Sequence, residues 1–432
     1  MPVGSMKSRR VSSESVHLVT TTVMGLVDWL IANGWTGYDP YDALAFFPFL
    51  PIESLRMRYY SKLRKLLYPI SLLPSVFPKA TRIALQVKKS ANAKAAGVLV
   101  KAYLNLFEVT GDKSYLTESN SLLQWLVRNP SRGYGHLCWG YPFHWQTPAL
   151  FVEAGTPSAV VTSQVTQALS RGYELTGEQW MLKAAADSCR FFTKRLNIYE
   201  DHRGICFSYT PLDTYRVHNA NVMTAFTLAM FENIAGTNIY DDLIRKAVDF
   251  TISDQTEEGA FFYYDRAYSE SCGLAVGNHV DNLHTGYVIE YLAGLNTLLD
   301  ENKRIADAVR KSIPFYRRRM ISRGCVPVPR LGVGRFFPVV VDIHDCAETI
   351  IVFSRLYRSR FIPSLDPAVH TAEWTIRNLH DTSGYFYNAI FLWGKGRFPY
   401  LRWGQAWMLY ALSELLKAMA QPRDHISKLG SN

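Results

Sequence analysis

The sequence predicts an all-α protein in which six helical hairpins close into a ring, an (α/α)6 toroid. Apolar residues recur with helical periodicity in twelve segments of the 432-residue chain. Similar helix ends recur at Gly111, Gly177 and Gly236, where each glycine is placed to form a left-handed helix cap. Long loops rich in aromatic residues and glycine connect the two helices of each predicted pair. They favour a closed ring with an elaborated mouth over an open solenoid.

The twelve predicted helices alternate between two compositions. One set carries more charge and is expected to form the outer ring, over residues 17–33, 113–128, 179–195, 240–254, 303–321 and 366–380. The other set is richer in Ala, Gly, Leu and aromatic residues, over residues 87–108, 160–175, 218–234, 281–299, 344–358 and 403–418. Helices of the second composition are buried on most faces, so we expect them to form the inner ring. Only short aromatic segments, such as 261–264 and 385–387, are predicted to be β.

One domain is expected over residues 17–420, with a flexible segment at 1–16 and a tail at 421–432. Hydrophobic residues make up 48% of the chain and charged residues 19%, a balance that excludes disorder for most of it. We recognise no apolar run of about 20 residues and no secretory signal. The six cysteines form no CxxC pair, which excludes a redox or zinc-knuckle motif and predicts a cytoplasmic protein.

Polar clusters open five of the predicted inner helices. They are Thr162, Ser163 and Gln164; His218, Asn219 and Asn221; Asp281, Asn282 and His284; Asp342, His344 and Asp345; and Arg402, Trp403 and Gln405. Because all inner helices of a toroid run the same way, the clusters are predicted to converge on one funnel. Helix capping explains Asp and Asn at one such position, but five clusters containing His, Trp and Gln exceed what capping needs.

Carboxylates and histidines of these clusters are the candidates for chemistry. Glycosidic hydrolysis uses two carboxyl groups about 5 to 10 Å apart, and a histidine is a suitable acid or base near neutral pH. The catalytic candidates are Asp281 and Asp342, with Asp345 in reserve, assisted by His218, His284 and His344. Their spacing matches no known metal motif, so neither a metal nor another cofactor is expected.

Substrate binding is assigned to aromatic and polar residues predicted to lie at the mouth. Flat rings stack on sugar faces, although such residues also fill cores. The candidates are Asp39, Tyr41, Trp139, Tyr141, Trp145, Tyr209, Asn219, Asn221, Asn282, Tyr287, Arg402, Trp403 and Gln405.

The formal net charge of +10 favours an anionic partner such as an acidic glycan. The alternative reaction is elimination or epimerisation of a uronic acid, with His218, Asn219 and Tyr287. A third class is a non-catalytic protein that binds a glycan during assembly. The chain has no P-loop, GxGxxG or GxSxG, so nucleotide hydrolysis, dinucleotide redox chemistry and serine hydrolysis have no support.

Nine basic residues and no acidic ones lie between Arg56 and Lys89. This basic segment 56–89 is either a solvated connection between the first two helices, the favoured interpretation, or a contact with a membrane surface or a lipid-linked substrate. A nucleic-acid partner is not expected, because no base-reading motif accompanies the charge.

Several motifs of the chain resemble a bacterial and archaeal family found with exopolysaccharide and capsule genes. They occur in the order GYDPYDAL (37–44), WGYPFHWQ (139–146), GTPSAVVT (155–162), CFSYTPLD (206–213), VHNANV (217–222), VDNLHTGYVIEYL (280–292), VDIHDCAE (341–348), GYFY (384–387) and RWGQAWMLYAL (402–412). Family members are often labelled polysaccharide biosynthesis protein VpsJ, or delta-aminolevulinic acid dehydratase. The second label fits poorly, because that chemistry belongs to a TIM barrel with a Schiff-base lysine.

This resemblance spans roughly residues 35–412. It implies an (α/α)6 toroid and a role in surface-glycan assembly, and it does not imply a reaction. Together with the mouth clusters, it leads us to expect a glycoside hydrolase that acts on an acidic glycan in surface-polysaccharide biosynthesis.

Overall fold

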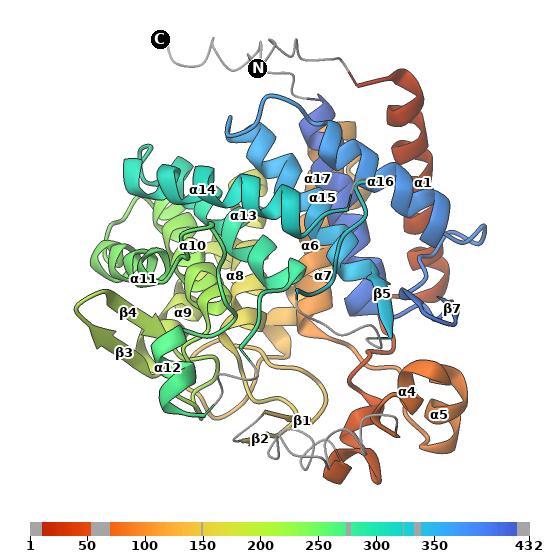
Figure 1. Cartoon of the computed structure of the whole chain (residues 1–432), viewed down its shortest axis with the longest axis horizontal. Coiled ribbons are helices and arrows are strands. Elements are labelled where there is room, and N and C mark those ends of the chain that lie inside the picture. Colours follow the sequence, from red (N-terminus) through yellow and green to blue (C-terminus); the bar gives the residue numbers. More distant parts are fainter. Residues whose placement is uncertain are drawn as a thin grey trace.

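A closed ring of helices forms the centre of the molecule (Figure 1). The computed structural model describes residues 11–52, 70–147, 150–273, 278–322, 324–331 and 338–420. The inner helices of this described part are α6 (Ala93–Thr110), α8 (Ala159–Thr176), α10 (His218–Ala235), α13 (Asn282–Leu298), α15 (Ile343–Arg358) and α17 (Trp407–Ala420). Each packs against the next, and α17 packs against α6, so the ring closes. The predicted (α/α)6 toroid is thereby confirmed.

An outer layer of helices covers the ring. It consists of α1 (Ser13–Asn33), α7 (Ser114–Arg128), α9 (Gln179–Lys194), α11 (Asp241–Ser253), α14 (Lys303–Arg319) and α16 (Asp366–Leu379). All twelve helices agree with their predicted bounds to within six residues at each end.

The pairing of the helices differs from the prediction in one respect. The sequence grouped each outer helix with the inner helix that follows it. In the structure each outer helix from α7 onward packs most closely on the inner helix that precedes it, and α1 packs on α17 and α16. The reason is loop length: inner-to-outer turns are short, whereas outer-to-inner connections are long.

Glycine caps end three of the inner helices, as predicted. Gly111, Gly177 and Gly236 have φ values of 74°, 73° and 65°, a left-handed conformation that disfavours residues with a Cβ atom. Each cap N–H donates to a carbonyl of the last helical turn. These caps allow the chain to reverse within a few residues, so each outer helix folds back on its inner partner.

Short strands lie in the loops at one end of the ring (Figure 1). They are β1 (Trp145–Gln146), β2 (Phe151–Val152), β3 (Ile198–Asp201), β4 (Gly204–Phe207), β5 (Val339–Asp342), β6 (Ala389–Phe391) and β7 (Gly394–Gly396). All pairings are antiparallel: β1 with β2, β3 with β4, and β6 with both β5 and β7. The predicted β segments 261–264 and 385–387 were wrong as strands, because Tyr264 and Phe386 form only isolated bridges.

Smaller helices complete the described chain: η1 (Ala43–Ala45), α4 (Leu73–Val76), α5 (Pro78–Ala84), α12 (Arg266–Ser271) and the π-helix η2 (Leu401–Ala406), which leads into α17. Helices α4 and α5 project beside the end of the ring that carries β1 and β2 (lower right in Figure 1). Residues 1–10, the predicted tail 421–432 and the basic residues from Arg56 to Lys65 lie outside the described residues.

Helix α1 is long and apolar enough, by length and composition, to cross a membrane, which the sequence analysis did not recognise. Its side chains Val19, Val23 and Leu26 are buried in the common core of the ring. The core helix of a globular protein and a signal sequence near the N-terminus both meet the same length and composition criteria.

Candidate active site at the mouth of the ring

Polar residues gather where the inner helices begin, as predicted. Asp281 caps α13, and the His284 N–H donates to its Oδ1 at 2.7 Å. Asp342 caps α15, and the His344 N–H donates to its Oδ1 at 2.8 Å. Since α13 packs against α15, these two carboxyl groups stand on neighbouring helices at the same end of the ring, which we call the mouth.

Asp281 forms a dyad with His284 that points toward the mouth. The Nδ1 atom of His284 lies 2.7 Å from Oδ2 of Asp281, and Nε2 of His279 lies 2.8 Å from the same oxygen. Burial alone would raise the pKa of Asp281, but the two imidazoles outweigh burial and hold the pKa below its usual range. Asp281 therefore stays ionised and orients the His284 ring.

The far side of the His284 ring is open. About 30% of its side chain is exposed, and among the described residues Nε2 has no hydrogen-bond partner. His279, which was not among the predicted site residues, is parallel to the Tyr263 ring at 5.5 Å. The signal for His279 was its position two residues before the cap Asp281.

Asp342 has the opposite electrostatic character. Burial raises its pKa to about 6, in spite of the hydrogen bonds from the His344 N–H and from Nε1 of Trp403. Burial, together with the charges of Asp342 and Asp281, also raises the pKa of Asp345 well above its usual range. Asp342 is partly exposed while Asp345 is buried, so Asp342 is the carboxyl group of this pair that a ligand can reach.

His344 lies beneath Asp342 in the wall of the ring. Its Nε2 is 3.0 Å from the Tyr287 hydroxyl, and its ring packs against Trp403 and Trp407, with centroids at 4.5 and 4.8 Å. Burial, followed by the cations Lys94 and Arg402, lowers the pKa of His344, so its imidazole is neutral near pH 7. His344 and Tyr287 are both buried.

Arg402 and Asp39 form a buried ion pair behind the mouth. Nη2 of Arg402 donates to Oδ1 of Asp39 at 2.8 Å, and Nε donates to Oδ2. The guanidinium carbon lies 5.1 to 5.8 Å from the ring centroids of Tyr41, Tyr141 and Trp403. One cation thus contacts its neighbour Trp403 and two aromatic side chains from separate loops, Tyr41 and Tyr141, a cation–π arrangement.

These rings continue into an aromatic wall. Successive ring contacts link Trp403, Tyr41, Phe143, Tyr141, Trp145 and Tyr209 in that order. Tyr41 is the most open of them, with 42% of its surface exposed. The structure therefore brings together the predicted residues Tyr41, Tyr141, Trp145, Tyr209, Arg402, Trp403 and Asp39.

Other predicted site residues are buried and hold the fold. Trp139 donates its Nε1–H to the Leu126 carbonyl, Gln405 pairs with the Phe386 backbone, and Asn282 bonds Tyr316 and Thr349. Their amide and indole groups satisfy other groups of the protein, so they present no polar group to the mouth.

The polar side chains at the start of α10 are likewise buried in the protein and do not reach the mouth. His218 lies 2.9 Å from Asp254, and Asn221 bonds the Phe207 and Ala247 backbone. Asn219 is buried, with its Oδ1 unpartnered. This part of the predicted funnel is closed by protein.

Lys94, at the start of α6, was missed by the sequence analysis. Its Nζ lies 5.8 Å from the Tyr287 ring centroid and 5.5 Å from that of Trp407. Burial lowers its pKa well below the usual value, and Arg402 adds to the shift. A lysine in the otherwise small and apolar run that opens α6 was the available signal.

Two clusters among the described residues have ligand atoms within 4.8 Å of one another and so could hold a metal ion: His279, Asp281 and His284, and His218, Asp254 and Asp265. In the first cluster, both imidazoles pair with Asp281 at hydrogen-bonding distances. In the second, Asp254 and Asp265 pair with Arg266 and Arg203.

No family model matches the chain, and no curated protein matches its sequence. Solved structures match its fold. A possible member of glycoside hydrolase family 105 from Salmonella enterica has a TM-score of 0.61 at 11% identity, over 96% of this chain and 98% of that one. A sugar epimerase from a ruminal bacterium has a TM-score of 0.59 at 13% identity, over 78% and 90%.

An inactive variant of an α-1,6-mannanase from Salegentibacter, in complex with α-1,6-mannotriose, has a TM-score of 0.51 at 15% identity, over 77% of this chain and 90% of that one. The three neighbours are carbohydrate-active proteins, and at these identities they show that the fold is shared. The reaction has to be argued from the site itself.

Proposed function

We propose that the protein is a glycoside hydrolase that cleaves an acidic glycan at the mouth of the ring. The observation that carries the proposal is a carboxyl group and an oriented imidazole on neighbouring helices at the mouth. His284, oriented by the ionised Asp281, offers an open imidazole nitrogen, and Asp342 is a carboxyl group whose burial raises its pKa to about 6. A carboxyl group with a raised pKa can donate a proton, and an accessible imidazole nitrogen can accept one.

The two groups would divide the reaction between them. Asp342 would donate its proton to the glycosidic oxygen as the bond breaks. His284 would take a proton from the attacking water, and the Asp281 carboxylate would stabilise the imidazolium that forms. The aromatic wall would bind the apolar face of the sugar rings.

An acidic substrate is supported by charge. The chain carries a net charge of +10, and Arg402, which is paired with Asp39, lies behind the aromatic rings. The place in surface-polysaccharide biosynthesis is supported by the motif resemblance described above.

The test is an assay of purified protein on neutral and acidic polysaccharides, with two readouts. New reducing ends report hydrolysis, and ultraviolet absorbance of an unsaturated uronate reports elimination. We expect reducing ends without absorbance, and a loss of at least about 100-fold in Asp342→Asn and His284→Gln, the range of general acid–base catalysis. Glu153→Gln, an exposed carboxylate in a mouth loop, serves as the matched control and should keep full activity. Absorbance that rises with the reducing ends would overturn the proposal in favour of a lyase.

A second candidate is a sugar epimerase. Tyr287 lies between two imidazoles, with ring centroids 6.5 Å from His284 and 6.3 Å from His344. Epimerisation needs a group that removes a proton from carbon and one that returns it. In D2O an epimerase would place deuterium on the sugar carbon without producing reducing ends, and His344→Gln would abolish the exchange. This reaction is the weaker candidate because His344 is buried, so a substrate carbon cannot reach its imidazole.

A further inference from the structure

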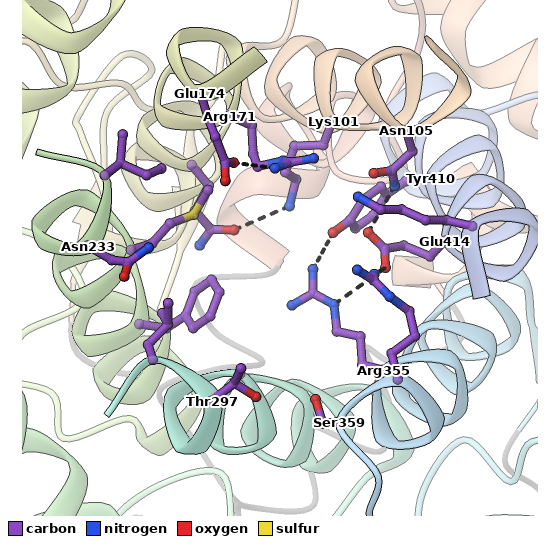
Figure 2. A pocket seen from close by; sticks show the side chains of 18 of the residues that line it. Lys101, Asn105, Arg171, Glu174, Asn233, Thr297, Arg355, Ser359, Tyr410 and Glu414 are labelled. Atoms are coloured by element: carbon purple, nitrogen blue, oxygen red, sulfur yellow. Dashed lines mark hydrogen bonds and ion pairs between the residues drawn. The ribbon is translucent and has the colours of Figure 1, made fainter. Parts of the chain in front are cut away.

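A second cavity lies on the ring axis at the end opposite the mouth (Figure 2). Its volume is about 450 Å³, within the range of small-molecule sites. Every inner helix contributes to its wall, through Lys101, Arg171, Asn233, Thr297, Arg355 and Glu414. Asn282 and Thr297 stand at opposite ends of α13, roughly 22 Å apart at 1.5 Å per residue. This rear cavity is therefore separate from the candidate active site.

Cations predominate in the rear cavity. Its described lining includes six basic side chains, Lys101, Arg171, Arg355, Arg358, Arg360 and Lys417, and two carboxylates, Glu174 and Glu414. Two more carboxylates lie just behind the wall: Glu108 pairs with Arg171 and Lys417, and Glu290 pairs with Arg355. Six cations against four carboxylates leave an excess of two positive charges.

Burial shifts the protonation of this cluster in both directions. It lowers the pKa of Lys101 to about 7 and that of Lys417 below its usual value, and it raises the pKa of Glu290. The four arginines of the lining, Arg171, Arg355, Arg358 and Arg360, stay charged near neutral pH, so the wall remains cationic.

The wall of the rear cavity also suits a polyhydroxylated ring. Phe226 and Tyr410 contribute aromatic side chains, and Asn233 contributes an amide. The amides of Asn105 and Gln167 also line the cavity and already donate to Glu414 and Thr227. In Figure 2 the Arg355 side chain extends into the opening, and Lys101 points toward it from the other side. Guanidinium groups bind phosphate with two parallel hydrogen bonds.

We propose that the rear cavity is a second ligand site, for a phosphorylated monosaccharide. The arginine-rich wall matches a phosphate dianion, which carries more negative charge than a sugar monocarboxylate and accepts paired hydrogen bonds from a guanidinium group. The amides and the two aromatic rings match the hydroxyl groups and the apolar face of the sugar. This site is independent of the reaction proposed at the mouth.

Isothermal titration calorimetry tests the proposal, with glucose 6-phosphate as the probe and glucose and glucuronate as comparisons. We expect glucose 6-phosphate to bind and the other two to bind at least about tenfold more weakly. Arg358→Gln should weaken binding at least about tenfold. Arg358 suits the test because 31% of its side chain is exposed, so its replacement leaves no cavity in the core. Its ion-pair partner Glu414 keeps the hydrogen bond from Asn105.

Three further variants make the result decisive. Arg171→Gln should also weaken binding, and it replaces Arg358→Gln if thermal melting shows that variant to be unfolded. Arg304→Gln, on the outer helix α14 and paired with Asp249, and Asp342→Asn at the mouth should bind as the wild type does. The proposal is overturned if the wild type does not bind glucose 6-phosphate, if glucuronate binds equally well, or if Asp342→Asn loses binding while the two arginine variants keep it.

Discussion

At the scale of single residues, the raised pKa of Asp342 affects both the stability of the fold and the proposed chemistry. Its pKa rises from 3.8 to about 6 in the folded protein because of burial. The folded state then binds a proton more tightly than the unfolded chain does. Stability therefore falls as pH rises from about 4 to about 6, and it stays lower above that range.

Replacing this carboxyl group with an amide should therefore stabilise the fold at neutral pH. We expect Asp342→Asn to raise the free energy of unfolding by about 1 to 2 kcal/mol at pH 7.5, a value reduced for the partial exposure of the side chain. The gain should vanish at pH 4. Urea unfolding at both pH values measures it, and an equal loss of stability at both would contradict this account of Asp342.

The ion pair of Arg402 and Asp39 is a second prediction at this scale. Both side chains are about 3% exposed, so removing one partner leaves a buried charge without compensation. We expect Arg402→Gln to cost about 3 to 5 kcal/mol. The double variant Asp39→Asn/Arg402→Gln should recover part of that loss. A double-mutant cycle by chemical denaturation measures the coupling, and additive losses would mean that the pair contributes nothing as a pair.

At the scale of elements, the small helices α4 and α5 are tied to the mouth by one side chain. Arg82 of α5 pairs with Asp42, and its Nη2 donates to the Asp39 carbonyl at 2.6 Å. Asp39 in turn holds Arg402. Arg82 was counted in the solvated basic segment, but it is buried, and its role is to fix this projection beside the candidate active site.

The same projection exposes apolar side chains. Phe77, between α4 and α5, is 58% exposed and Ile83 of α5 is 67% exposed, and Phe47, which follows η1, is 81% exposed. The sequence contains no acidic residue from 54 to 107. Apolar side chains combined with basic charge suit a surface of anionic lipid. We therefore propose that this projection contacts a membrane surface.

Vesicle co-sedimentation tests that contact. The protein should bind vesicles that contain phosphatidylglycerol, and Phe47→Ser and Phe77→Ser should each weaken binding by about tenfold, the loss of one buried apolar side chain. Ile239→Ser is the matched control, because Ile239 is 69% exposed on the turn between α10 and α11. Equal binding by all variants, or no binding by the wild type, would contradict the proposal.

At the scale of the whole molecule, the ring could be predicted because buried helices show a periodic pattern of apolar residues in the sequence. Inner helices such as α6 are apolar on nearly every face, and glycines such as Gly111 mark helix ends that need a positive φ. These signals are local, so they can be recognised in the sequence without the structure. The pairing of α1 with α17 joins the two ends of the ring and has no local signal.

The site was predictable only in part, for a related reason. Asp281 and Gln405 stand at equivalent places in the sequence, at the start of inner helices. The loop that packs against each helix decides whether the polar side chain is accessible. The Gln405 amide bonds to the Phe386 backbone, whereas the His284 side chain stays partly exposed. A polar residue at a helix start predicts where a site can form, and only tertiary packing decides which residues remain accessible.

The pH dependence of kcat/KM for release of reducing ends from an acidic oligosaccharide tests the role of Asp342 as the general acid. We expect the rate to fall about tenfold per pH unit above a pKa near 6, as Asp342 loses the proton that it donates. In Asp342→Asn the rate should be much lower and this limb should be absent. An unchanged limb in the variant would contradict the assignment of Asp342, and elimination products in place of reducing ends would contradict hydrolysis.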